Sequence, residues 1–169
     1  PPSIPGMRLN AQLTRMASAK ARVILGSPLA AIHAADGRIQ AVDYASAGRA
    51  TRVETRAVIL AAGGFESGAL ELDSYGAVAD TVCGLPVMGP TGQLLHADFW
   101  GDEQPLFLAG LAVDDSMRVV DDNGTPVYTN LFAAGGNLAG ATRWREKSGE
   151  GIALASALAA VDAIVEELK

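Results

Sequence analysis

The sequence predicts an α/β fold that combines a parallel sheet, an antiparallel β-meander and a long C-terminal helix. Two apolar runs, 57–62 and 131–134, each lead into paired glycines, as buried parallel strands do where they end at a ligand crevice. An Asp-Gly pair at 36–37 separates two apolar segments, which is a strong hairpin signal. Leucine and valine recur with helical spacing between Leu154 and Leu168, which predicts the helix.

The composition is that of a globular chain with one core. Of 169 residues, 49% are hydrophobic, and 19 acidic against 13 basic residues give a net charge of -6. This acidity opposes nucleic-acid binding, which needs a basic face. A single cysteine, Cys83, indicates a half-buried thiol in a reducing cytoplasm. No apolar run reaches the roughly 18 residues of a membrane span, and the proline-rich start without signal-peptide features indicates a piece of a longer protein.

The first half of the chain reads as a helix followed by strands. Leu9, Leu13 and Met16 lie at i, i+4 and i+7, which predicts an amphipathic helix from about residue 5 to residue 20. A β pattern follows at 23–25, 29–34, 39–44 and 51–55. We therefore expect a small antiparallel meander that leads into the buried strand at 57–62.

The second half is less regular until its last element. A short helix is expected at 66–76, then an irregular, cap-like segment at 80–105 in which 94–100 is helical. Short strands at 111–113 and 117–120 are joined by acidic turns. The final helix runs from about Gly151 to the end with an apolar stripe, and its alanines permit close packing on a sheet.

The glycine pairs are the candidate cofactor site. Small residues after each strand let a ligand approach the backbone, and a helix N-terminus carries a partial charge of about +0.5 that favours electron-rich groups. The alternatives are a tight turn that needs glycine, and ordinary capping of the helix by Ser148. The candidate cofactor-binding residues are Ala62, Gly63, Gly64, Gly135, Gly136, Asn137, Gly149, Glu150, Gly151 and Ile152.

Three side chains are candidates for chemistry on a substrate. Arg143 and Arg145 lie on a charged loop before the helix and are suited to hold a phosphate or carboxylate, although a solvated charged loop is the commoner explanation for such a cluster. His96 is a candidate for proton transfer, whereas His33 falls in a predicted strand and is expected to be structural. No zinc spacing or hydrolase motif occurs, so we expect no metal site.

Three motifs carry a resemblance to a known family. Residues 55–65 (TRAVILAAGGF), 130–136 (NLFAAGG) and 149–153 (GEGIA) resemble the carboxyl-terminal half of the two-part flavin-binding fold of fumarate reductase and succinate dehydrogenase flavoproteins. The stretches 1–13 and 148–164 resemble, more narrowly, the family of anaerobic glycerol-3-phosphate dehydrogenase B subunits. The resemblance implies a partial FAD/NAD(P)-binding fold, doubly wound and three-layered, in which 57–65 and 131–169 face the cofactor.

The resemblance also implies a function. It implies oxidation of sn-glycerol 3-phosphate to dihydroxyacetone phosphate in anaerobic respiration, with FAD or FMN bound in the full-length protein and none bound to this piece. The partners implied are a catalytic A subunit and an iron–sulfur C subunit, at the inner face of the cell membrane. Residues 62–64 would lie beside the nucleotide, and the later glycines near the flavin ring. Glu150 departs from the glycine-rich pattern of the family.

The other half of such a fold is missing from the sequence. A Gly-x-Gly-x-x-Gly turn, with an acidic residue about 20 positions further on, normally holds the cofactor pyrophosphate and ribose, and neither occurs here. We therefore expect a piece that binds flavin poorly and has no turnover alone. Two alternatives stay open: a fumarate reductase-like or ketosteroid-like flavoprotein, and a non-catalytic module whose irregular middle and loop 143–147 dock a partner subunit.

Overall fold

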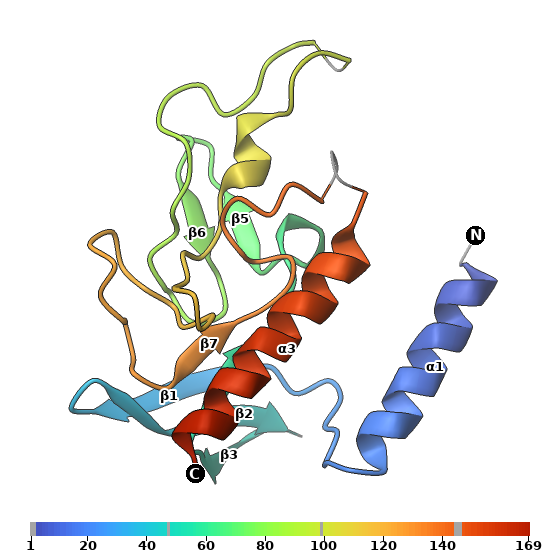
Figure 1. Cartoon of the computed structure of the whole chain (residues 1–169), viewed down its shortest axis with the longest axis vertical. Coiled ribbons are helices and arrows are strands. Elements are labelled where there is room, and N and C mark those ends of the chain that lie inside the picture. The colour runs from blue at the N-terminus through green and yellow to red at the C-terminus, as the bar shows by residue number, and fades with distance from the viewer. Residues whose placement is uncertain (1–2, 47, 99, 144–146) are drawn as a thin grey trace.

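The computed structural model describes residues 3–46, 48–98, 100–143 and 147–169. Figure 1 shows helix α1 standing to one side of a body built from short strands, long loops and helix α3. The helices are α1 (Ile4–Ser18) and α3 (Gly149–Glu167), with single 3-10 turns η1 (Phe65–Ser67) and η2 (Pro105–Leu108). The strands are β1 (Leu29–Ala35), β2 (Arg38–Ser46), β3 (Arg49–Glu54), β4 (Val58–Leu60), β5 (Leu70–Leu72), β6 (Val78–Asp80) and β7 (Leu131–Ala133).

The predicted meander is confirmed. Strands β1, β2 and β3 pair antiparallel in that order. The turn between β1 and β2 holds Asp36 and Gly37 at φ values of 51° and 70°, as a type I′ turn requires. The buried side chain of Asn130 joins the meander to the next sheet, because its amide accepts from Ile39 N and donates to Ile39 O, both at 2.8 Å.

The two apolar runs form neighbouring parallel strands, as predicted. β4 pairs with β7 in the register Val58 with Leu131 and Leu60 with Ala133. Both strands contribute to a core that also contains Ile39, Leu111 and Val119. The α/β class with an antiparallel meander and a long C-terminal helix is therefore confirmed.

The middle of the chain differs from prediction in its elements. The helix expected at 66–76 is wrong: Gly68, at φ 74°, ends the single turn η1, and a β5–β6 hairpin follows. The hairpin forms because the Asp73 carboxylate accepts the N–H groups of Tyr75 and Ala77 and stabilises a turn. The segment 94–100 contains no helix among its described residues. The expected strands at 111–113 and 117–120 pair only through isolated bridges.

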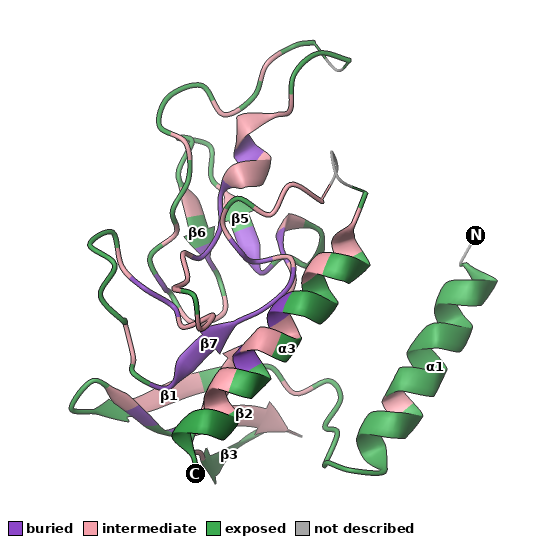
Figure 2. Ribbon diagram, viewed as in Figure 1, coloured by how far each residue is buried: buried purple, intermediate pink, exposed green. Residues whose placement is uncertain are grey.

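Helix α3 forms as predicted, but its apolar stripe does not face the sheet. Ser156 and Ala160 are the buried residues of α3, whereas the stripe from Leu154 to Leu168 is between 38% and 74% exposed. The small side chains permit a close approach to β7, and the larger ones point to the opposite side. Helix α1 likewise buries no residue, and Figure 2 shows it exposed except for one intermediate band. The expected strand at 23–25 is exposed coil.

Candidate functional site

The two glycine turns lie side by side because their strands are parallel neighbours. Each turn begins at the carboxyl end of its strand, where Leu60 pairs with Ala133. Ala134 N donates to Leu60 O at 3.0 Å, which continues the pairing into the second turn. Gly63 and Gly135 both adopt left-handed φ values, 87° and 83°. Glycine is therefore favoured at the first position of each glycine pair, three residues after Leu60 in one turn and two after Ala133 in the other.

Backbone contact between the turns requires glycine at position 64. A Cβ on Gly64 would lie 2.6 Å from Gly136 O and 3.1 Å from a guanidinium nitrogen of Arg143. A Cβ on Gly136 would lie 3.0 Å from Arg143 and 3.4 Å from Gly64 N. Within the described part of the chain, the N–H groups of Gly64 and Gly136 donate to no protein acceptor. The turns thus present bare backbone donors at one place.

Side chains hold both turns in shape. Ser67 Oγ donates to Ala62 O and Gly64 O at 2.7 and 2.9 Å. Gly135 N donates to the buried Ser156 Oγ at 2.9 Å, which ties the second turn to α3. Neither serine was singled out from the sequence. The sequence does carry a signal for Ser156: it is a serine among the alanines of the last helix, and such a polar side chain needs a hydrogen-bond partner.

Asn137 is a candidate residue with an unused polar atom. The side chain is 2% exposed, and its Nδ2 donates to Leu60 O at 3.0 Å. That bond fixes the amide orientation and leaves Oδ1 without a hydrogen-bond partner in the described structure. A buried acceptor without a partner is rare in folded proteins. At this strand end it suits a ligand that brings a donor.

Arg143 lies against the glycine turns rather than in solvent. A Cβ added to Gly64 or Gly136 would lie 3.1 or 3.0 Å from its guanidinium, and the Arg143 side chain is 23% exposed. The carboxylate of Glu66, two residues after Gly64, accepts a hydrogen bond from Arg143 Nη2 at 3.1 Å. This pairing spans 77 positions, so the sequence offered no signal for it. A cation held there by one contact is suited to bind an anionic ligand group.

The second turn of α3 packs against the second glycine turn. A Cβ on Gly135 would be 3.8 Å from the Cβ of Ala153. Gly149, Glu150, Gly151 and Ile152 form the start of the helix after Ser148 at the N-cap position. Ala153, directly after these four residues, is the contact with Gly135, so the predicted role of residues 149–152 at the cofactor stays a prediction.

The other two candidates for substrate chemistry are placed differently. His96 forms hydrogen bonds within its own loop. Its backbone N–H donates to Gln104 Oε1 at 2.8 Å, and its ring Nε2 lies 3.2 Å from Glu103 O. None of these bonds reaches the glycine turns. Arg145 lies outside the described residues, so its predicted role stays a prediction.

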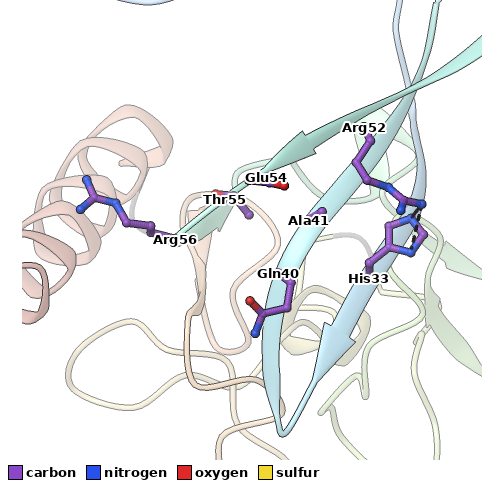
Figure 3. A pocket seen from close by; sticks show the side chains of 7 residues that line it. All are labelled: His33, Gln40, Ala41, Arg52, Glu54, Thr55 and Arg56. Carbon is purple, nitrogen blue, oxygen red and sulfur yellow. Dashed lines mark hydrogen bonds between the residues drawn. The ribbon is translucent and has the colours of Figure 1, made fainter.

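A groove lies on the meander, and an ion-pair cluster lines part of it. This groove of about 710 Å³ is lined by His33, Gln40, Ala41, Arg52, Glu54, Thr55 and Arg56. Figure 3 shows the imidazole of His33 beside the guanidinium of Arg52, with Arg56 at the other end of the groove. His33 Nε2 lies 2.7 Å from Asp43 Oδ2. The hydrogen bond from Arg52, and then that of His33, lower the Asp43 pKa to about 2. His33 is thus part of a surface ion-pair cluster.

Cys83 is half-buried, in surroundings that suppress its reactivity. Burial, followed by the charge of Asp80, raises the pKa of the Cys83 thiol to about 11, which keeps it protonated and unreactive. Among the described residues, no three His, Cys, Asp or Glu side chains gather as a metal site. No described helix has the length and apolar character needed to cross a membrane.

Comparison with known proteins identifies the family of the chain. The chain is 28% identical over 172 residues to proteins named as the probable B subunit of anaerobic glycerol-3-phosphate dehydrogenase, from two strains of Halobacterium salinarum, R1 and NRC-1. The match covers 99% of this chain and 40% of each relative. No solved structure matches this chain. The sequence profile described as FAD binding domain matches residues 1–152. The chain therefore belongs to the FAD binding domain family.

Proposed function

We propose that this chain is part of a flavin-dependent dehydrogenase that oxidises sn-glycerol 3-phosphate to dihydroxyacetone phosphate. The observation that carries the proposal is the contact between the two glycine turns, where a Cβ on Gly64 would collide with Gly136 O. Such a cradle leaves the N–H groups of Gly64 and Gly136 open to a ligand, and it belongs to a chain of the FAD binding domain family. The similarity to B subunits of glycerol-3-phosphate dehydrogenase supports the substrate.

The residues present fit part of an FAD site. Gly64 and Gly136 offer backbone donors, Asn137 Oδ1 offers a buried acceptor, and the α3 N-terminus brings a partial positive charge. When bound, FAD supplies the oxidant that takes up the hydride of the secondary carbinol. The role of this chain is to hold and orient that group. Residues 57–65 and 131–169 form the cofactor-facing part in this proposal, and 80–105 is the covering segment.

Arg143 is the residue proposed to hold the substrate phosphate. Its guanidinium already lies over both glycine turns, and its present partner, Glu66, is half exposed and exchangeable. A phosphate offers two oxygens to the guanidinium, whereas Glu66 uses one contact at 3.1 Å. Arg145 and His96 are proposed to assist, Arg145 as a second cation and His96 in proton transfer.

The assembly is also a proposal. The relatives are named as B subunits, which implies that they work with other subunits. We place this chain with a catalytic A subunit and an iron–sulfur C subunit, at the inner face of the cell membrane.

The test uses the full-length protein that contains this chain. Purified protein should show the visible absorbance of FAD, and anaerobic addition of sn-glycerol 3-phosphate should bleach it. Arg143→Ala should raise KM for this substrate by about tenfold or more, since one charge-assisted contact contributes about 1.5–3 kcal/mol, and Arg143→Lys should recover part of that loss. Protein that carries no flavin would refute the proposal. Bleaching by another substrate, with none by glycerol 3-phosphate, would refute its substrate alone.

A further inference from the structure

An acidic side chain lies beside the glycine turns, at the place where an anionic ligand group would bind. Glu66 Oε2 lies 3.1 Å from Arg143 Nη2. The same oxygen would lie 3.5 Å from a Cβ on Gly64, so it borders the bare face of that glycine. The carboxylate of Glu66 therefore lies against the same guanidinium and the same backbone to which the proposed function assigns the substrate phosphate.

The backbone that carries Glu66 is fixed on both sides. Before it, the ring of Phe65 packs edge-on against Phe107, with 6.4 Å between the ring centres. After it, the hydroxyl of Ser67 donates to two carbonyl oxygens of the first glycine turn at 2.7 and 2.9 Å. The Glu66 side chain itself is 50% exposed. Its carboxylate can therefore leave Arg143 for solvent by rotation about side-chain bonds, without movement of η1.

The guanidinium of Arg143 is less exposed than the carboxylate that it binds. The Arg143 side chain is 23% exposed, and its Nη1 would lie 3.0 Å from a Cβ on Gly136. A cation in this position has lost part of its hydration, so the loss of its partner would leave a partly desolvated and unpaired charge. The exchange of one anion for another avoids this cost, because Arg143 stays paired throughout.

We propose that Glu66 is an internal competitor for the anion subsite at Arg143 and the glycine turns, and that a ligand phosphate binds there by displacing the Glu66 carboxylate into solvent. The identity of the phosphate rests on the proposed function. A phosphate can displace the carboxylate because it offers two oxygens to the guanidinium and a third to the N–H groups of Gly64 and Gly136. Glu66 makes one contact with Arg143.

A competing Glu66 and a supporting Glu66 affect anion binding with opposite signs. If Glu66 only oriented Arg143, its removal would leave a less ordered guanidinium and would weaken anion binding. If Glu66 competes, it lowers the fraction of molecules whose subsite is open, and the observed Kd is the intrinsic Kd divided by that fraction. Removal of the carboxylate then tightens anion binding by about two- to fivefold, the factor that corresponds to a partly exposed ion pair.

The test measures the binding of inorganic phosphate to the full-length protein by calorimetry, at low ionic strength and without substrate. Glu66→Gln should lower the Kd for phosphate by about two- to fivefold. Glu71→Gln is the matched control, because Glu71 is an exposed carboxylate on β5 that forms no ion pair within the described part of the chain. This control removes the same charge and should leave the Kd unchanged. Arg143→Ala should weaken phosphate binding and should cancel the difference between Glu66 and its glutamine variant.

The outcomes separate this inference from the proposed function. A Kd that is unchanged or higher in Glu66→Gln would overturn the competition, and so would an equal gain in Glu71→Gln, since net charge would then explain it. If Arg143→Ala abolishes phosphate binding while Glu66→Gln does not tighten it, this inference fails and Arg143 keeps its proposed role. If Arg143→Ala leaves phosphate binding unchanged, both fail. Glu66→Ala provides the same comparison if the glutamine variant does not fold.

Discussion

Replacing Gly64 by alanine should force the two glycine turns apart. The added Cβ would lie 2.6 Å from Gly136 O, whereas ordinary contacts begin at 3.4 Å, so the turns must separate by about 0.8 Å. The neighbour is backbone and cannot rotate away as a side chain can. The φ of Gly64 is −127°, outside the left-handed region, so the expected cost comes from this contact. Overpacking of this kind costs about 1–3 kcal/mol.

The assay is chemical denaturation of the 169-residue chain, with Gly149→Ala as the matched control. A Cβ on Gly149 meets nothing within 4 Å, and the residue lies in the first turn of α3. Alanine is favoured over glycine in a helix by up to about 1 kcal/mol, so the control should be neutral or slightly more stable. The Gly64 variant should lose about 1–3 kcal/mol of unfolding free energy. A Gly64→Ala variant as stable as the parent would show that the turns are not in contact.

Three further predictions follow from single groups. Ser156→Ala leaves the N–H of Gly135 buried without an acceptor, so the unfolding free energy should fall by about 1–3 kcal/mol in denaturant titrations. The hydrogen bond from Arg52 lowers the Asp43 pKa from 3.8 to about 2, so as pH falls the unfolded chain binds this proton before the folded chain does. The stabilisation from Asp43 is therefore present above pH 3.8 and is lost as pH falls toward 2. Asp43→Asn should flatten the dependence of the unfolding free energy on pH in that range. Cys83, with a pKa of about 11, should react with iodoacetamide at pH 8 far more slowly in the folded chain than in urea.

The glycine turns were predictable because their signals are local. A strand of apolar residues that ends in glycines is visible within nine residues, and the parallel pairing of β4 with β7 follows from two copies of it. The Asp36-Gly37 hairpin is similarly local, since both residues need positive φ. Such features depend on neighbouring residues, which the sequence shows directly.

The parts that were not predictable depend on tertiary contacts. The pattern of α3 has two apolar sides, and periodicity cannot tell which one meets the sheet; packing against β7 selected the side of Ser156 and Ala160. The contact of Arg143 with Glu66 joins residues 77 positions apart. The segment expected to be a helix at 66–76 forms a hairpin, because Gly68 and the turn at Asp73 stop the helix. Helical propensity alone underestimates the effect of these two residues.

The buried face of α3 and its exposed apolar stripe from Leu154 to Leu168 have separable roles. Arg118 donates to Glu167 near the end of the helix and lies 5.4 Å from the ring centre of Phe132, while Ser156 holds the middle of the helix to Gly135. These contacts are eleven residues apart, about 16 Å along the axis at 1.5 Å per residue. Two fixed points set the direction of the helix without any contribution from the stripe. A substitution on the stripe should therefore leave the arrangement of the Gly64 and Gly136 backbone donors as it is.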